Sequence, residues 1–489
     1  MTTWPRHGND FAWEAAGAPV QCRPMADEQA VVRKVLWRLV PFGVVCYLMN
    51  YVDRVNVSVA SLTMVYDQKT GTGIAGFSEK VFTMGTAIFF LGYFIFELPS
   101  NLIQERVGPR RWIARIMISW GLITMMFVGV RGAWSFYGLR FLLGVAEAGF
   151  FPGMILYLSH WVPHEHRARA SAMFLTSTAI AGVIGNPLGG VIMYAARGSP
   201  LGLASWQWLF LTEGLPSVLL GVVTLFYLTD RPADAVWLTA QERTTLAAVL
   251  KRENDAHPGH GKQGLLDAFK SRHTWVLTLF YSMVVFAFYM VNFYTPRIIR
   301  DSLVSGGVVA ADTPKVLIDL WVCLFAAIPF GAAAVGMVLI GRHSDKTNER
   351  KMHLAFACLM ITAGMTLAAT ASSMATGKLG TVLTITGLSV SAIGSFGIFG
   401  PFWALPPQLM TGTAAAAAFA IINSIGNLLG GFLGPMLQNV LNREQTMLVA
   451  AGLGGVAMVI ALVAPIPRHV DKVSGVEVVR DAEPDGAQV

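Results

Sequence analysis

Charged residues are scarce in this sequence, and their scarcity excludes most classes of soluble protein. Asp, Glu, Lys and Arg make up 13% of the 489 residues, whereas soluble domains carry about 25%. Hydrophobic residues reach 54%, and the mean hydropathy is +0.54. A single water-soluble core cannot bury so much apolar surface, so the chain is expected to lie in a lipid bilayer.

Cysteines, catalytic motifs and cofactor motifs are also few or missing. The four cysteines lack disulfide or zinc-ligand spacing. No phosphate-binding Gly-Lys loop, nucleophile elbow or haem motif occurs, which argues against catalysis and against ATP as an energy source. The net charge of +7 does not indicate nucleic-acid binding, because the basic residues lie in short loops between apolar runs. We expect no enzyme activity, no cofactor and no metal site.

Long apolar runs are abundant, and each is a candidate membrane helix. A helix needs about 20 mostly apolar residues to cross a bilayer. Twelve such runs occur, at 35–60, 80–104, 112–130, 134–157, 168–195, 205–228, 273–298, 317–341, 352–372, 378–402, 413–438 and 446–467. The sequence therefore predicts an all-α integral membrane protein with twelve transmembrane helices.

The longest polar stretch divides these helices into two sets of six. The predicted parts are a tail at 1–34, a half at 35–228, a central loop at 229–272, a second half at 273–467 and a tail at 468–489. In the central loop, Thr239 and Glu242 have the spacing of a capping box, and an apolar stripe follows them. An amphipathic helix is therefore expected in this loop.

Basic residues are distributed unequally between the two sides of the predicted helices. One set of tails and loops carries 25 Lys and Arg residues, and the opposite set carries 9. Cytoplasmic segments are the richer ones in membrane proteins. Both termini and the central loop are therefore predicted to be cytoplasmic. Residues 1–30 lack an apolar signal region, so no cleaved signal peptide is expected.

One charged motif occurs twice, in the loops after the second and eighth runs. The copies read Asn101-x-x-x-Glu105-Arg106-x-Gly108-x-Arg110-Arg111 and Gly341-x-x-x-Asp345-Lys346-x-Asn348-x-Arg350-Lys351. Equivalent positions of the two copies are separated by the same number of residues throughout (345 against 105, for example). This constant separation indicates duplicated halves with a site between them near the membrane midplane. The charges are expected to clamp the helices that they join, with Glu97 taking part. Ordinary cytoplasmic loop charge is the alternative interpretation.

This motif resembles the cytoplasmic loop signature of the major facilitator superfamily, with departures at Asn101, Glu105 and Asn348. Other stretches resemble its anion:cation symporter family: Tyr51-x-Asp53-Arg54-x-Asn56, Glu97-Leu98-Pro99-Ser100-Asn101, 140–147, Asp230-Arg231-Pro232, Pro401-Phe402-Trp403 and 423–427. The resemblance, strongest to the tartrate/phthalate branch, implies proton-coupled uptake of a small organic carboxylate. It also implies a monomer in a bacterial-type inner membrane, with the anion, protons and lipid as partners.

Four charged residues inside the predicted helices matter most, because a charge there costs about 2.5–3.5 kcal/mol. Arg54 and Arg140 lie at similar distances from one membrane face and are predicted to bind the substrate carboxylate. Arg140 and Glu147 are seven residues apart and share a helix face. Burial favours protonated Glu147 and a nearby arginine favours the ionised form, so Glu147 is the predicted proton-coupling acid, with Asp53 as its rival. A static Arg–acid pair that locks two helices is the alternative.

Aromatic and amide side chains complete the predicted substrate site. The first half supplies Tyr51, which shares a face with Arg54, and Tyr93 in the second helix. The remaining candidates are Asn186, Trp403, Asn423 and Asn427. For each of these residues, packing between helices is the alternative role. Glu213 lies in the sixth run, and the sequence identifies no partner for it.

A proton-driven exporter or an anion exchanger of the same fold is the alternative function. Antiporters of this superfamily carry a Gly-Pro-x-x-Gly-Gly signature in the fifth helix. Here the run is Gly185-Asn186-Pro187-Leu188-Gly189-Gly190. The departure favours uptake.

Overall fold

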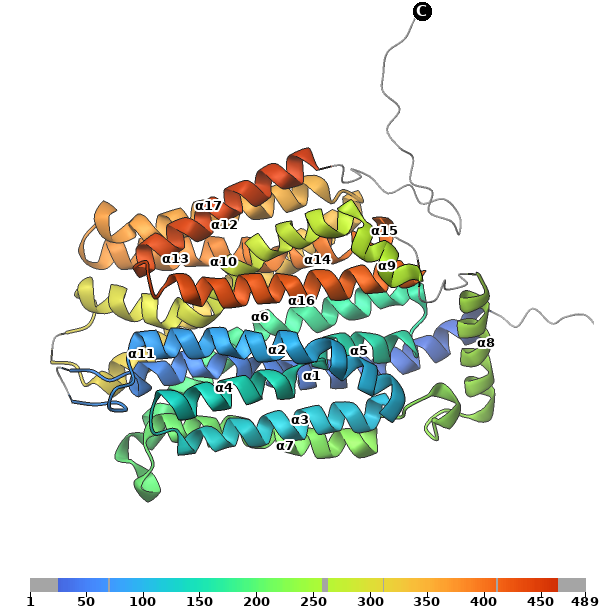
Figure 1. Cartoon of the computed structure of the whole chain (residues 1–489), viewed down its shortest axis with the longest axis horizontal. Helices are drawn as coiled ribbons and strands as arrows, with labels where there is room; N and C mark the ends of the chain where they lie inside the picture. Colours follow the sequence, from blue (N-terminus) through green and yellow to red (C-terminus); the bar gives the residue numbers. More distant parts are fainter. Residues whose placement is uncertain (1–24, 69–70, 257–262, 311, 410–411, 465–489) are drawn as a thin grey trace, which may run out of the picture.

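A computed structural model describes residues 25–464 except 69–70, 257–262, 311 and 410–411, and it is almost entirely helical (Figure 1). The membrane-length helices are α1 (Met25–Met64), α2 (Glu79–Val107), α3 (Pro109–Met126), α4 (Ala133–Glu147) continued by α5 (Phe150–Ser159), α6 (His164–Ala195), α7 (Ser205–Tyr227), α10 (Arg272–Ser305), α11 (Lys315–Thr347), α12 (Lys351–Met374), α13 (Gly377–Gly397) continued by α14 (Phe399–Trp403), α16 (Gly412–Leu437) and α17 (Arg443–Val463). Shorter helices are α8 (Ala240–Ala256), α9 (Gln263–Lys270) and α15 (Pro406–Leu409). Four 3-10 turns are η1 (Phe127–Gly129), η2 (Ala196–Gly198), η3 (Pro200–Gly202) and η4 (Pro232–Asp234).

Twelve spans in the described part of the chain are long and apolar enough to cross a membrane, which confirms the predicted fold class. Their ends differ from the prediction where a helix continues past the apolar run. The first helix begins at Met25, inside the predicted tail at 1–34, and α10 extends to Ser305. The predicted tail at 468–489 lies outside the described residues.

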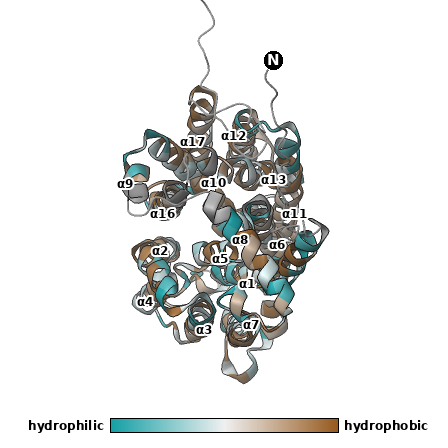
Figure 2. Cartoon of the chain, turned by 90° about the vertical axis from the view of Figure 1, so that its right-hand side faces the viewer, coloured by the Kyte–Doolittle hydropathy of each residue, from teal (hydrophilic) through white to brown (hydrophobic). Residues whose placement is uncertain are grey.

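The helices form two groups that face each other, α1–α7 and α10–α17 (Figures 1 and 2). Within the first group α3 packs on α7 and α2 on α4, and within the second α12 packs on α13 and α17. Between the groups α2 packs on α16, α6 on α11 and α1 on α10. These three pairs form the seam at which a site between the halves was predicted.

Glycine residues allow helices α2 and α4 to pack closely against each other. A Cβ atom added at Gly144 of α4 would lie 2.1 Å from the carbonyl oxygen of Phe89 on α2. A Cβ atom added at Gly92 of α2 would likewise lie 2.5 Å from the carbonyl oxygen of Phe141. Backbone atoms cannot yield as a flexible side chain can, so this pair of helices tolerates only glycine at its crossing.

Replacing Gly144 with alanine is expected to force α2 and α4 apart and to lower the midpoint of heat unfolding in detergent. Overpacking of this kind costs about 1–3 kcal/mol. Gly138→Ala on the same helix is the matched control, because nothing lies within 4 Å of an added Cβ atom there. Equal midpoints for the two variants would contradict the close-contact argument.

The end of the molecule that carries both charged loop motifs is called the motif end, and the opposite end is called the far end. Gly108 has a φ of +97°, and Asn348, at the equivalent position of the second copy, has a φ of +53°. Only glycine adopts positive φ freely, and asparagine is among the few other residues that tolerate it. Asparagine at position 348 can therefore adopt a positive φ, as glycine does at position 108.

The clamp predicted for the motif forms in only one of its two copies. In the second copy, Arg350 donates to Asp345 at 2.6 Å. In the first copy, Arg110 pairs instead with Asp230, which follows α7, and the distance between Arg110 Nε and Asp230 Oδ2 is 3.7 Å. The backbone amide of Arg110 also donates to Asp230 at 2.9 Å, while Glu105 is exposed. Both ion pairs lie within their own half and do not cross the seam.

The central loop contains helix α8, which lies against the first half at the motif end (Figures 1 and 2). The backbone amide of Thr239 donates to Glu242 at 2.8 Å and that of Glu242 to the Thr239 hydroxyl at 3.2 Å, as expected of a capping box. Lys34 donates to Glu242 at 2.8 Å, and the pKa of Glu242 is lowered by this bond and by the Thr239 amide. A second ion pair joins α8 to α1, between Arg252 and Glu28 at 2.9 Å.

Candidate functional site

A buried ion pair lies between α1 and α4, in the first half of the molecule. Arg54 donates to Glu147 Oε2 from Nη2 at 2.8 Å and from Nε at 3.1 Å. Asn50, one turn earlier on α1, donates to the same oxygen at 3.1 Å. Both members of the pair are buried, and the second carboxylate oxygen of Glu147 has no hydrogen-bond partner within residues 25–464, as far as the structure describes them. Glu147 is therefore only half-satisfied.

A break in the fourth span places Glu147. It is the last residue of α4, and the chain resumes as α5 after Gly149, which has a φ of +87°. A Cβ atom added at Gly149 would lie 2.3 Å from the Ser100 hydroxyl of α2. The left-handed turn and the close approach both require glycine, and together they hold the break against α2.

Arg140 is the second arginine of the site, and most of its guanidinium has no partner. Its side chain is fully buried, and Nε donates to the carbonyl oxygen of Gly85 at 3.2 Å. Both terminal nitrogens are buried without a hydrogen-bond partner among the described residues. The guanidinium carbons of Arg140 and Arg54 lie 4.7 and 5.4 Å from the centre of the same Phe89 ring. The two arginines thus flank one aromatic side chain, which agrees with the prediction that they lie at a similar depth in the membrane.

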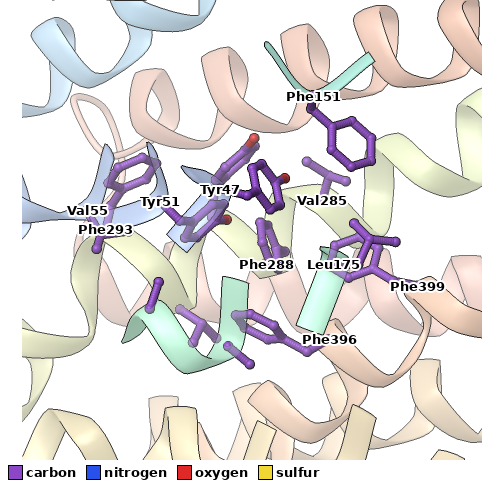
Figure 3. Packing of buried hydrophobic residues seen from close by; sticks show 14 of the residues in the cluster. Tyr47, Tyr51, Val55, Phe151, Leu175, Val285, Phe288, Phe293, Phe396 and Phe399 are labelled. Carbon is purple, nitrogen blue, oxygen red and sulfur yellow. The ribbon is translucent and has the colours of Figure 1, made fainter. Parts of the chain in front are cut away.

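Aromatic rings of the first half surround Arg54, and one of them also contacts a ring of the second half. The Tyr51 and Tyr93 ring centres lie 5.7 and 5.3 Å from its guanidinium carbon. Tyr51 also approaches Phe288 of α10, with ring centres 6.3 Å apart, and its hydroxyl is buried with no hydrogen-bond partner in the described structure. Figure 3 shows Tyr51 and Phe288 gathered in the cluster between the halves. Both predicted tyrosines are thus beside the arginine that they were expected to accompany.

The two predicted asparagines of α16 belong to a hydrogen-bonded row that reaches back to the first half. Tyr289 of α10 donates to Asn427 at 2.9 Å, and Asn427 donates to Asn423 at 3.1 Å. Asn423 in turn donates to Glu97 of α2 at 2.6 Å, and Ser424 also donates to Glu97. Glu97 therefore does not join the loop clamp, contrary to the prediction, because its side chain faces α16.

Asp53 faces away from the arginine that follows it in the sequence. Its carboxylate accepts from Trp120 of α3 at 2.9 Å and from the Ser217 hydroxyl of α7. Adjacent residues on a helix point about 100° apart, so Asp53 connects α1 to α3 and α7, while Arg54 faces α4. Glu213, one turn before Ser217, is buried with Asn56 beside it.

Two other candidates have partners outside this cluster. Asn186 donates to the carbonyl oxygen of Gly182, one turn earlier in α6, at 2.8 Å. Trp403 packs on Phe419 of α16, with ring centres 4.0 Å apart, and on Tyr281 at 5.1 Å. These contacts correspond to the packing roles that the sequence left open.

Ion pairs join the two halves at the far end. Glu79, at the start of α2, lies 2.9 Å from Arg297 and 2.6 Å from Arg443, both in the second half. Lys315 of α11 lies 3.9 Å from Asp67, which follows α1. Opening of the far end would have to break these contacts.

Tyr289 and Glu97 were not predicted as site residues, and the far-end ion pairs were not predicted either. Tyr289 lies in an aromatic-rich helix where nothing distinguishes its hydroxyl. Glu97 was visible as an acid in a predicted span, and the high cost of burying an acid was a usable signal.

Comparison with known sequences identifies the family. Residues 43–435 match the Major Facilitator Superfamily. A protein of Agrobacterium vitis named "Putative tartrate transporter" is 42% identical over 430 residues, which cover 88% of this chain and 92% of that protein. The "Quinolone resistance transporter" of Acinetobacter baumannii is 36% identical over 426 residues, covering 87% of this chain and 91% of that protein.

Solved structures agree on the fold. A bacterial homologue of the human lysosomal transporter Spinster, inward-facing and unoccupied, superposes with a TM-score of 0.65 at 14% identity, over 88% of this chain and 97% of that one. The Escherichia coli xylose transporter XylE, partially occluded and inward open, also gives 0.65 at 14% identity, over 88% and 98%. These matches confirm the resemblance inferred from the motifs. The chain belongs to the Major Facilitator Superfamily and is a multi-pass membrane transporter, not an enzyme.

Proposed function

We propose that this protein takes up a small organic carboxylate together with protons, by alternating access between its two halves. One observation carries the proposal: Arg140 is a fully buried cation whose terminal nitrogens find no hydrogen-bond partner in the part of the chain that the structure describes. A buried charge without partners is costly, and such a group calls for a ligand. A carboxylate is the ligand that a planar guanidinium fork binds best.

The surroundings of Arg140 support an anion of modest size. The substrate carboxylate would bond to Arg140, while Arg54, Tyr51 and Tyr93 would contact the rest of the anion. The unpartnered hydroxyl of Tyr51 is a free donor for it. The Agrobacterium vitis relative, named a tartrate transporter, supports a carboxylate as the substrate class.

Glu147 is the proposed coupling acid because it competes with the substrate for Arg54. In the absence of substrate, Arg54 and Asn50 stabilise the ionised carboxylate. An anion that bonded to Arg54 would withdraw that support, and the buried acid would then favour its protonated form. Substrate and proton would consequently bind together. A static pair of Arg54 and Glu147 would not explain why both terminal nitrogens of Arg140 lack a hydrogen bond among the described residues.

The sidedness proposed here follows from the distribution of basic residues. With the motif end in the cytoplasm of a bacterial inner membrane, the far-end ion pairs close the outer side. The arrangement described would then be an outward-closed state. Both termini would be cytoplasmic.

Proteoliposome uptake tests the proposal directly. Purified protein should accumulate radiolabelled tartrate or another member of a carboxylate panel when the lumen is alkaline relative to the medium. A protonophore should abolish the accumulation, and protein-free liposomes provide the control. If no carboxylate in the panel enters faster than in protein-free liposomes, the proposed substrate class is wrong.

Proton-driven export is the second candidate, because a relative that covers most of the chain is named for quinolone resistance. The same liposomes distinguish the two. An antiporter would accumulate its substrate when the lumen is acidic relative to the medium, and a quinolone would serve as the second labelled compound.

A further inference from the structure

Glu97 is a buried acid that the proposed coupling does not use. Its residue is 2% exposed, on α2 of the first half, and both of its bonding partners lie on α16 of the second half. Asn423 donates to one carboxylate oxygen at 2.6 Å, and the Ser424 hydroxyl donates to the other. Helices α2 and α16 lie side by side along the seam (Figure 1). The carboxylate therefore joins the two halves by two hydrogen bonds.

The bonds of Glu97 continue into the proposed anion site. Each donor in the row from Tyr289 through Asn427 and Asn423 points toward Glu97. An ionised carboxylate only accepts hydrogen bonds, so it fixes the orientation of both amides in the row. At the other end of the row, the Tyr289 phenol lies beside Arg54, and its ring centre is 4.4 Å from that of Phe90 on α2.

We infer that Glu97 is a positioning residue of the transport site: it holds the row Tyr289–Asn427–Asn423 of the second half against Arg54 of the first. The site is then complete only while α2 and α16 are joined. The inference rests on the proposed function for the identity of the site, but the joining of the halves does not depend on which substrate is carried.

A distance measurement without substrate tests the joining of the halves. Spin labels at Asp234→Cys and Lys270→Cys would report the separation of the halves at the motif end, since both positions are exposed there. Cys22 would be replaced by serine, and the other three cysteines are buried. A hydrogen bond to a charged group is strong enough to change a two-state ratio about tenfold. Glu97→Gln is therefore expected to raise the ratio of long to short distances about tenfold.

Glu213→Gln is the matched control, because Glu213 is also a buried acid and its neighbour Asn56 belongs to the same half. Its distance distribution should remain that of the parent protein. An unchanged distribution in Glu97→Gln, or an equal change in Glu213→Gln, would overturn the inference. Ser424→Ala removes one of the two hydrogen bonds without altering the acid. If Glu97→Gln does not fold, the same distance measurement on Ser424→Ala decides whether these bonds join the halves.

A double-mutant cycle tests the positioning role. Tartrate binding would be measured by thermal shift for Glu97→Gln, Tyr289→Phe and the double variant. If Glu97 acts through the row, each single change weakens binding about tenfold and the double change weakens it hardly further. If the losses of affinity of the two single variants multiply in the double variant, the positioning role is wrong. If the parent protein binds no carboxylate, the proposed function fails, and the distance measurement alone decides whether Glu97 joins the halves.

Discussion

Replacing Arg140 with alanine is expected to weaken carboxylate binding about 100-fold or more while the protein still inserts and folds. Within the described part of the chain, the guanidinium makes one hydrogen bond, from Nε to the Gly85 carbonyl. Its removal therefore breaks little internal structure. Loss of a buried charge partner commonly costs about 2–5 kcal/mol of binding free energy, which corresponds to that factor.

Ligand-induced thermal shifts in detergent would measure the effect, with tartrate and the carboxylate panel as ligands. Arg115→Ala is the matched control, because that arginine also lies over an aromatic ring, Trp112, at 3.9 Å, but on α3. Arg54→Ala should abolish binding as well, and it should also destabilise the protein because it leaves Glu147 with Asn50 alone. Wild-type affinity in both Arg140→Ala and Arg54→Ala would eliminate the anion site.

Replacing Glu147 with glutamine is expected to separate exchange from proton-driven accumulation. Glutamine has the shape and charge of a protonated glutamate, but it cannot release a proton. Exchange of substrate between two pools needs no net proton movement, so it should continue. Accumulation driven by a pH gradient should be lost. Paired counterflow and pH-driven uptake assays in the same proteoliposomes would measure both.

Asp53→Asn is the comparison for that experiment. Because Asp53 bonds to Trp120 and Ser217 and not to Arg54, its replacement is expected to loosen α1 from α3 and α7. If Asp53 were the coupling acid, Asp53→Asn would lose pH-driven uptake while Glu147→Gln kept it. Loss of counterflow and uptake together in a folded Glu147→Gln protein would support the static ion pair.

The twelve spans could be predicted because bilayer thickness requires about 20 apolar residues in each helix. The similar depth of Arg54 and Arg140 could also be predicted, since α1 and α4 run in opposite directions. These inferences depend on position along a helix axis. Such positions follow from a count of residues.

The bonding partners could not be predicted in the same way, because they depend on how each helix is rotated against its neighbours. Asp53 adjoins Arg54 in the sequence, yet their side chains face different helices. Glu97 precedes the loop motif by only a few residues, yet it faces α16 across the seam. Arg110 pairs with Asp230, which follows α7, whereas Glu105 of its own loop motif is exposed.

The docking of α8 has a consequence for the size of the transport motion. Because α8 is held to α1 by ion pairs, it moves with the first half. Helix α9 packs on α16 and so moves with the second. Only the chain from Ala256 to Gln263 connects them, and a chain of that length spans at most about 25 Å when fully extended. The covalent link therefore sets an upper limit on how far the halves can part at this end.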